Sequence, residues 1–300
     1  MVSLSVLAVI VWGINFGIDF TGGSLLEVNF ISDKLEKAEV ENILSSIMDI
    51  DSEIIQSFSV RETGESGYIL RSKMIDDAEK NIIISALQNI APKNAESREP
   101  VSRELEEVRF TNIGPTLGNE LKSKAIVAIV VVILAIILFV AFAFRHVSKP
   151  ISSWKYGLVA ILAFVHDVAV PIGLFAVLGQ FFAVEIDSLF VIAILVVLGY
   201  SINDTIVVFD RIRENLKHVP ENHRADKFED VVGKSLLQTI GRSVNTSITT
   251  SIMLLALFFF GGETTKWFAL ALLTGVIVGT YSSIFFATPM LVSWSKKRGR

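Results

Sequence analysis

Five long apolar segments dominate the sequence and restrict the folds that the chain can adopt. They span residues 124–144, 155–178, 187–209, 239–260 and 267–292. A helix needs about 20 largely apolar residues to cross roughly 30 Å of bilayer hydrocarbon, and each segment is long enough. Hydrophobic residues make up 51% of the chain and charged residues only 19%, which fits this interpretation. We therefore predict a polytopic α-helical membrane protein with a five-helix transmembrane region over residues 123–293.

A sixth apolar segment, residues 1–16, is too short for a complete span. Its apolar stretch, residues 2–16, would be about 22 Å long as a helix at ~1.5 Å per residue. It lacks the basic lead and the small-residue cleavage site of a signal peptide. We expect it to be the outer part of a first transmembrane helix, apparently truncated at its beginning. The alternative is a complete, short interfacial helix.

Residues 17–122 differ from the rest of the chain in charge and in pattern. They hold 20 acidic and 11 basic residues, whereas the remainder is net positive. Their hydrophobic periodicity switches between the spacings of strands and of helices. The predicted elements are a strand at 26–30, a helix at 34–48 with Asp33 as N-cap, strands at 54–60 and 68–71, a helix at 76–90, a polar loop at 92–100 and a strand at 105–113. The order β-α-β-β-α-β predicts a small α+β domain of the ferredoxin-like kind.

Basic residues outside the apolar segments predict the orientation in the membrane. They gather in the loops at 145–155 and 210–234 and in the tail at 294–300, whereas the loops at 179–187 and 261–267 carry only Lys266. Loops rich in lysine and arginine face the cytoplasm in most membrane proteins. We therefore expect both termini, including the basic tail, to be cytoplasmic and residues 17–122 to be extracytoplasmic.

A carboxylate and a guanidinium interrupt the fourth and fifth apolar segments. Asp204, preceded by Asn203, and Arg242 each lie ~8 Å along their helices from the same membrane face, at 1.5 Å per residue. Opposite charges at matching depth on antiparallel neighbours can pair, and pairing makes a buried charge tolerable. Thr246 and Thr249 share the face of Arg242 and could hold a file of water. We predict a proton pathway through these residues; the alternative is a static ion pair that fixes helix packing.

Other residues inside the apolar segments have weaker patterns. Asp167 follows His166 in the third segment, and we include Asp167 in the predicted proton pathway, although neighbouring polar side chains could simply satisfy it. We expect His166 to be a packed, hydrogen-bonded histidine. Gly275 and Gly279 form a GxxxG pair that favours close helix packing, and we assign the same role to Gly199.

The chain lacks the residues that several classes of function require. The chain has no cysteine and only four scattered histidines, so we expect no metal site and no thiol chemistry. The phosphate-binding pattern Gly-x-x-x-x-Gly-Lys-Ser/Thr does not occur, so no nucleotide-hydrolysing site is visible. We predict a non-enzymatic protein without a cofactor, in contact with membrane lipid and not with nucleic acid.

Six sequence stretches closely resemble the SecD/SecF family of protein-export membrane proteins, which belongs to the resistance-nodulation-division (RND) superfamily. They are GIDFTGGSLLEV, IGPTLGNEL, AFVHDVAVPIGLFAVLG, LGYSINDTIVVFDRIREN, QTIGRSVNTSITTS and FALALLTGVIVGTYSSIFFATP. The first contains the signature-loop residues Asp19, Gly22 and Gly23, and the fourth and fifth place Asp204 and Arg242 at the family's proton-pathway positions. The chain is most similar to the SecF side of the family.

The resemblance implies a bacterial cytoplasmic-membrane subunit with six transmembrane helices, half of an RND-type unit. Such a subunit pairs with SecD beside the SecYEG channel and a YajC-like auxiliary subunit. It uses the proton-motive force, with protons as the coupling ion, to draw unfolded secretory polypeptide across the membrane. Two alternatives remain: RND-type proton-coupled efflux of small hydrophobic solutes, and a non-transporting membrane scaffold.

Overall fold

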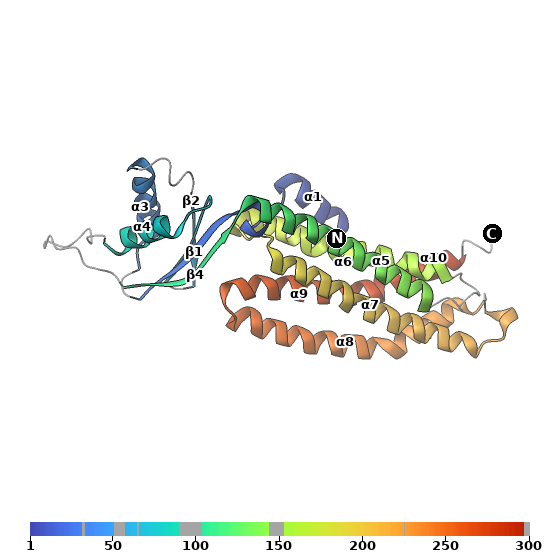
Figure 1. Ribbon diagram of the computed structural model, residues 1–300. Helices are drawn as coiled ribbons and strands as arrows, with labels where there is room; N and C mark the ends of the chain where they lie inside the picture. Colours follow the sequence, from blue (N-terminus) through green and yellow to red (C-terminus); the bar gives the residue numbers. More distant parts are fainter. Residues whose placement is uncertain are drawn as a thin grey trace. The chain divides into compact units, whose positions relative to one another are not determined.

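The computed structural model describes residues 1–31, 34–50, 58–64, 66–89, 104–143, 153–224 and 226–296. The chain divides into two compact units. We call residues 16–123 the sheet unit, and residues 1–15 together with 124–300 the helical unit. Figure 1 shows the elements of both units.

The sheet unit has the element order β-α-β-β-α-β. A one-turn helix, α2 (Ile18–Thr21), comes first; the others are β1 (Gly23–Phe30), α3 (Lys37–Ile50), β2 (Phe58–Thr63), β3 (Gly67–Ser72), α4 (Asp77–Gln88) and β4 (Leu105–Ile113). The strands form one antiparallel sheet in the order β2-β3-β1-β4, with an irregularity between β1 and β4 at Glu27/Val28. Helices α3 and α4 lie on the same side of this sheet (Figure 1).

Alternation along β1 builds the core of the sheet unit. Leu26, Val28 and Phe30 are buried, and the residues between them are only partly covered, as period-2 alternation requires. On β3, Tyr68 is buried, and its hydroxyl donates to the backbone oxygen of Leu35 at 2.6 Å. Burial raises the pKa of the Tyr68 phenol, so it remains a donor at neutral pH. The contact ties the segment before α3 to the centre of the sheet.

The structure shifts several predicted boundaries in this unit. Helix α4 begins after Asp76, whose side chain accepts from the Glu79 backbone N–H at 2.8 Å in a capping box. Helix α3 begins at Lys37, three residues later than predicted, and its predicted N-cap Asp33 lies outside the described residues. The predicted loop at 92–100 and the first half of the predicted strand at 54–60 also lie outside them.

The helical unit contains five helices that are long and apolar enough to cross a membrane. These candidate spans are Pro115–Ala143, Trp154–Phe182, Ser188–Lys217, Phe228–Phe260 and Thr265–Ser295. The helices are α5 (Pro115–Ala143), α6 (Ser153–Phe182), α7 (Ser188–Lys217), α8 (Phe228–Phe260), α9 (Glu263–Ser282), the π-helical η2 (Ser283–Ala287) and α10 (Thr288–Lys296), with a short 3₁₀ turn, η1 (Glu221–His223), between α7 and α8. A shorter apolar helix, α1 (Val2–Trp12), packs against α6. The spans confirm the prediction of a polytopic helical membrane protein.

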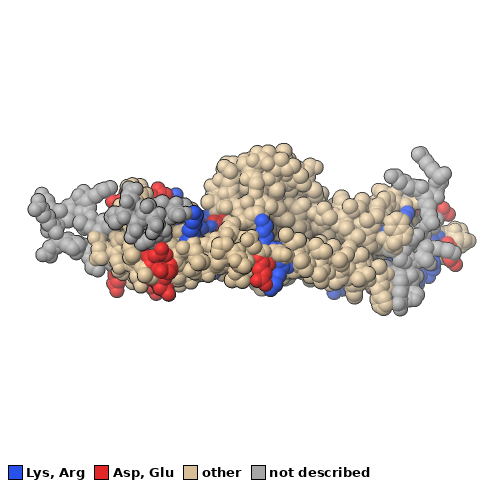
Figure 2. All heavy atoms as spheres, turned by 45° about the horizontal axis from the view of Figure 1, so that its top comes forward, with Lys and Arg blue, Asp and Glu red and all other residues tan. Residues whose placement is uncertain are grey.

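Several helices extend beyond the predicted apolar segments. Helix α7 continues to Lys217 and α8 begins at Phe228, so both have polar turns that hydropathy does not detect. These turns pair with each other: the Asn215 side-chain amide donates to Ser235 at 2.8 Å and to Gln238 at 2.9 Å. On the face seen in Figure 2, a broad tan area carries no Lys, Arg, Asp or Glu side chains.

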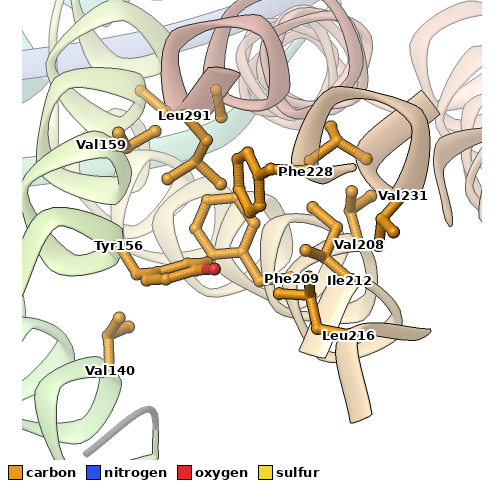
Figure 3. Close-up of a cluster of buried hydrophobic side chains, with 13 residues drawn as sticks. Val140, Tyr156, Val159, Val208, Phe209, Ile212, Leu216, Phe228, Val231 and Leu291 are labelled. Carbon is orange, nitrogen blue, oxygen red and sulfur yellow. The ribbon is translucent and has the colours of Figure 1, made fainter. Parts of the chain in front are cut away.

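Helix α9 is the central helix of this unit, because it packs against α6, α7 and α8. A cluster of buried apolar side chains from α5 to α8, η2 and α10 holds one end of the unit together (Figure 3). Phe209 and Tyr156 meet edge to face there, with ring centroids 5.3 Å apart. Ala287 of η2 and Leu291 of α10 belong to the same cluster, so the chain after α9 is anchored in it.

Candidate functional site

Asp204 lies on the inner side of α7 and only 4% of its surface is exposed. The buried positions along this part of α7 include Val197, Ser201, Asp204 and Val208, at the i, i+4, i+7 spacing of one helical face. The Thr280 hydroxyl of α9 donates to the Asp204 carboxylate at 3.3 Å. A buried carboxylate is costly unless it is hydrogen-bonded or neutralised, so this contact is the first element of a candidate site.

Hydroxyl groups continue the site from Asp204 across three helices. Thr280 also contacts the hydroxyl of Ser247 on α8, and Ser247 contacts the hydroxyl of Tyr200 on α7 at 3.2 Å. The Ser243 hydroxyl of α8 is buried and interacts electrostatically with Asp204, but it makes no hydrogen bond of normal geometry within the described part of the chain. A hydroxyl both donates and accepts, so this row can satisfy Asp204 in either of its protonation states.

Arg242 does not form the predicted ion pair with Asp204. Among the described residues no ion pair joins the two side chains, although the charge of Arg242 still acts on the carboxylate. Arg242 is exposed, and the buried face of α8 is instead formed by Ser235, Thr239, Ser243 and Ser247. Small hydroxyl side chains allow helices to approach closely, which a long arginine at the same position would prevent. The pairing prediction was therefore wrong about which side of α8 faces α7.

Three further predicted proton-pathway residues lie on exposed surfaces. Asn203, Thr246 and Thr249 are all exposed in the isolated chain. The Thr246 hydroxyl donates to the backbone oxygen of Arg242 at 2.9 Å, and that of Thr249 to the backbone oxygen of Asn245 at 3.0 Å. The structure therefore brings none of the three into contact with Asp204.

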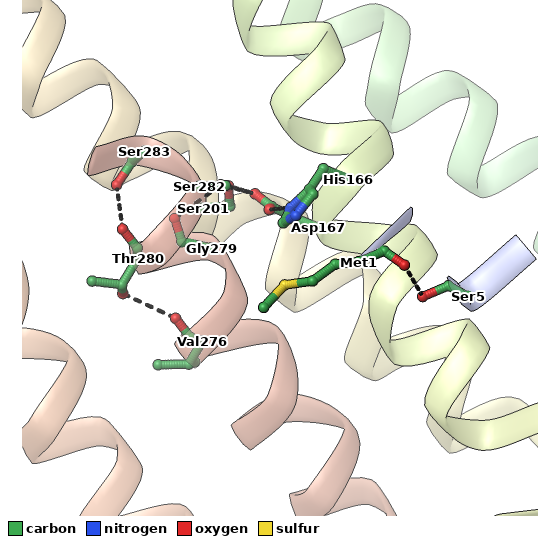
Figure 4. Close-up of polar contacts among 10 residues, drawn as sticks. All are labelled: Met1, Ser5, His166, Asp167, Ser201, Val276, Gly279, Thr280, Ser282 and Ser283. Atoms are coloured by element: carbon green, nitrogen blue, oxygen red, sulfur yellow. Dashed lines mark hydrogen bonds and ion pairs between the residues drawn. The ribbon is translucent and has the colours of Figure 1, made fainter. Parts of the chain in front are cut away.

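Asp167 lies at the centre of a second buried polar cluster. Its carboxylate is fully buried and accepts from Ser201 of α7 at 2.5 Å and from Ser282 of α9 at 2.8 Å (Figure 4). His166 Nδ1 lies 3.0 Å from the same carboxylate, and the imidazole stacks on Phe286 with ring centroids 5.6 Å apart. The prediction of a packed, hydrogen-bonded histidine is confirmed. Three helices thus meet at one carboxylate.

The two clusters adjoin. Ser201 precedes Asp204 by three residues on α7, and Thr280 precedes Ser282 by two on α9. Sequence reasoning identified both carboxylates but missed Thr280 and Ser201 as their partners. The small residues that recur along α9 from Gly275 onward could have indicated that α9 packs closely against α7 and supplies partners for the two carboxylates.

Two of the three predicted packing glycines bring α7 and α9 together. A Cβ on Gly275 would overlap the side chain of Val197, and one on Gly279 would lie 3.1 Å from the Cβ of Ser201. Gly199 is different, because a Cβ there would meet nothing within 4 Å among the described residues. It lies on the exposed face of α7, so its predicted packing role within this chain is wrong.

The signature loop belongs to the sheet unit. Gly22 and Gly23 have φ angles of 74° and 124°, which disfavour any side chain. A Cβ on Gly22 would lie 2.9 Å from the Cα of Pro115, and one on Gly23 would lie 2.7 Å from the backbone oxygen of Ser72. Asp19 lies in the first turn of α2. The glycines therefore allow β1 to begin tightly against the ends of β3 and β4.

Two family models match the chain. One is described as "Protein export membrane protein SecD/SecF, C-terminal" and matches residues 93–297; the other, "SecD/SecF GG Motif", matches residues 11–30. Protein translocase subunit SecF of Thermobaculum terrenum is 43% identical over 295 residues, which are 96% of this chain and 87% of that protein. The SecF of Anaerolinea thermophila is 37% identical over 302 residues, which are 100% and 91% of the two chains.

Solved structures of larger proteins are also similar. A crystal structure of SecDF, a translocon-associated membrane protein from Thermus thermophilus, superposes with a TM-score of 0.74 at 31% identity. The match covers 98% of this chain and 36% of that chain. A crystal structure of SecDF in a super-membrane-facing form gives a TM-score of 0.62 at 31% identity, over 99% and 37%. The chain thus spans just over a third of the SecDF chains that it resembles.

Proposed function

Because this chain belongs to the SecD/SecF family of protein-export membrane proteins, we propose that it is an auxiliary subunit of the Sec export machinery that works with a SecD partner. In this role it uses the proton-motive force to promote the passage of unfolded polypeptide across the cytoplasmic membrane. The SecYEG channel and a YajC-like subunit are its further partners, and no nucleotide hydrolysis takes place on it. The likeness to SecDF and the buried carboxylate in a membrane-length helix support the proposal.

The observation that carries the proton role is the environment of Asp204. Its described contacts are the Thr280 hydroxyl and the electrostatic influence of Ser243 and Arg242. A hydroxyl can donate to a carboxylate or accept from a carboxylic acid, and its bond to the charged form is the stronger one. Asp204 can therefore gain and lose a proton beside Thr280, and the strength of their contact changes with the charge. Arg242, Asn203, Asp167, Thr246 and Thr249 complete the proposed pathway, with protons as the coupling ion.

Removal of the titratable group at Asp204 tests this role. We expect Asp204→Asn to abolish the gradient-dependent stimulation of export in vesicles, because asparagine keeps an oxygen acceptor but has no group that takes up and releases a proton. Asp210→Asn is the matched control: it makes the same change on the same helix, at an exposed residue that pairs with Arg213 at 3.7 Å. Stimulation of export at the wild-type level by Asp204→Asn, with the gradient intact, would show that the proton role is wrong.

The outward polar face of α8 supports a membrane-embedded partner. Arg242, Asn245, Thr246 and Thr249 are exposed in the isolated chain, within a candidate span. An arginine facing lipid costs up to about 2.5–3.5 kcal/mol, the value at the bilayer centre, and a partner that supplies an acceptor lowers that cost. We assign this face to SecD, which would supply the other half of an RND-type unit.

Purification in mild detergent tests the partner. We expect SecD to co-purify with this chain and Arg242→Leu to reduce the yield, because leucine cannot pair with a polar partner. Phe260→Leu, at a 90% exposed position on the same helix, is the control and should leave the yield unchanged. Recovery of a homotrimer without SecD would instead favour efflux of hydrophobic solutes.

The remaining assignments follow from the family and from the pattern of the sheet unit. Its β-α-β-β-α-β order and its sheet order β2-β3-β1-β4 support a ferredoxin-like domain, which we place outside the cytoplasm. With α1 as the sixth membrane helix, both termini would be cytoplasmic. The sheet unit would then contact the emerging polypeptide.

A further inference from the structure

Helix α9 ends in a π-helical segment. Five residues, Ser283–Ala287, have i→i+5 geometry between α9 and α10. The Thr288 hydroxyl donates to the backbone oxygen of Ser283 at 2.7 Å and satisfies a carbonyl in this irregular turn. A π segment accommodates one extra residue in a turn, and such segments often occur at functional sites.

Both ends of the segment are held. Before it, Gly275 and Gly279 fix α9 against α7, and after it, Ala287 and Leu291 are buried in the cluster of Figure 3. A displacement of the extra residue by one turn leaves both anchors in place. Such a displacement rotates, by about 100°, only the residues between the original and the new position of the extra residue.

The residues in that turn contact both buried carboxylates. Thr280 donates to Asp204 at 3.3 Å and Ser282 donates to Asp167 at 2.8 Å. A rotation of about 100° would break both contacts together. The position of the extra residue therefore determines whether Asp204 has its hydroxyl partner.

The adjacent residues His166 and Asp167 of α6 hold the segment from two sides. Asp167 accepts from Ser282, the residue just before the segment (Figure 4). His166 stacks on Phe286 within the segment. Asp167 also accepts from Ser201 of α7, the helix that carries Asp204. The same carboxylate therefore connects the π segment of α9 to α7.

We propose that His166 and Asp167 are positioning residues that keep the extra residue of α9 at Ser283–Ala287 and thereby keep Thr280 against Asp204. This rests on the proton role proposed for Asp204. Protonation of Asp204 removes the negative charge that strengthens the hydrogen bond from Thr280, so the extra residue can move toward Gly279 and Thr280 withdraws. The described groups that act on Asp204 are Thr280 of α9 and Ser243 of α8, with the charge of the outward-pointing Arg242 acting at longer range; Ser201, Ser282 and His166 face Asp167.

The absence of cysteine from all 300 residues makes a site-specific probe simple. A nitroxide attached at Tyr281→Cys reports on the turn that rotates, because Tyr281 is 44% exposed. A nitroxide at Ile277→Cys, 55% exposed and one turn earlier, reports on the anchored part of α9. Both are measured by electron paramagnetic resonance on the chain in complex with SecD in vesicles.

The expected result is a change at one probe only. Asp204→Asn, which mimics the protonated state, should shift the ratio of mobile to immobile nitroxide at position 281 by about fivefold or more, the lower range of couplings between sites. The ratio at position 277 should stay constant. Asp167→Asn, and separately His166→Leu, should remove the response of position 281 to Asp204→Asn. If His166 and Asp167 were merely structural, their substitution would lower the stability of the protein, and position 281 would still respond to Asp204→Asn.

The outcomes separate this inference from the proton role. If Asp204→Asn abolishes export but the ratio at position 281 does not change, the positioning role is overturned and the proton role stands. If Asp204→Asn leaves export at the wild-type level, the proton role itself fails. Should Asp167→Asn not assemble with SecD, Ser282→Ala removes the same contact from α9, and a response at 281 that survives Ser282→Ala and His166→Leu overturns the inference.

Discussion

Gly23→Ala is expected to unfold much of the sheet unit while Gly64→Ala leaves it folded. Gly23 has a φ of 124°, a region that essentially only glycine occupies, and an alanine Cβ would lie 2.7 Å from the backbone oxygen of Ser72. The strain alone costs about 1–3 kcal/mol, and separation of β1 from β3 adds to it. Gly64 also has a positive φ, 56°, but a Cβ there meets nothing within 4 Å among the described residues, so about 1–2 kcal/mol is expected.

Hydrogen exchange of the two variants in the SecD complex measures this difference. We expect backbone amides of β1 and β3, including that of Leu26, to lose protection in Gly23→Ala and to keep it in Gly64→Ala. Equal loss of protection in the two variants would show that the close approach to Ser72 is unimportant.

Gly275→Ala is expected to destabilise the helical unit by about 1–3 kcal/mol, the usual cost of overpacking. The added Cβ would overlap Val197, whose β-branched side chain has few alternative rotamers in a helix. Gly199→Ala, the matched control, should stabilise the unit by up to ~1 kcal/mol, because alanine favours helix and nothing within 4 Å opposes it. The two substitutions should therefore shift the melting temperature in opposite directions.

A second substitution tests the cause. Val197→Ala removes the methyl groups that the new Cβ would meet, so it should recover part of the stability lost in Gly275→Ala. Thermal melting of the four variants of this double-mutant cycle in detergent gives the coupling. A coupling of zero would mean that α7 and α9 do not meet at this pair of residues.

Hydropathy alone predicted the central parts of five helices, because each of them is an apolar run long enough to cross a membrane. It could not locate the polar ends of α7 and α8, which are held by pairs such as Asn215 with Ser235. Those contacts depend on how the two helices pack against each other. The number of apolar residues in each helix does not predict that packing.

The site was predictable in its residue types but not in its geometry. A charged aspartate inside a membrane-length helix is energetically unfavourable without a partner. Asp204 and Asp167 could therefore be recognised as candidate site residues from the sequence alone. The depth of Arg242 could also be estimated from helical rise, but its direction around α8 could not. That direction is determined by the serine and threonine face opposite, which packs more closely than an arginine could. The irregular turn at Ser283–Ala287 has no counterpart in the hydrophobic pattern.

If a partner covers the outward-pointing Arg242, as proposed, the stability of this chain depends on the abundance of that partner. A protein that covers this side of α8 binds the native state and stabilises it by mass action. A copy synthesised in excess of that protein keeps the cost of an arginine in lipid. We therefore expect the amount of this chain in a cell to follow the supply of its partner, so that unmatched copies are the first to be lost.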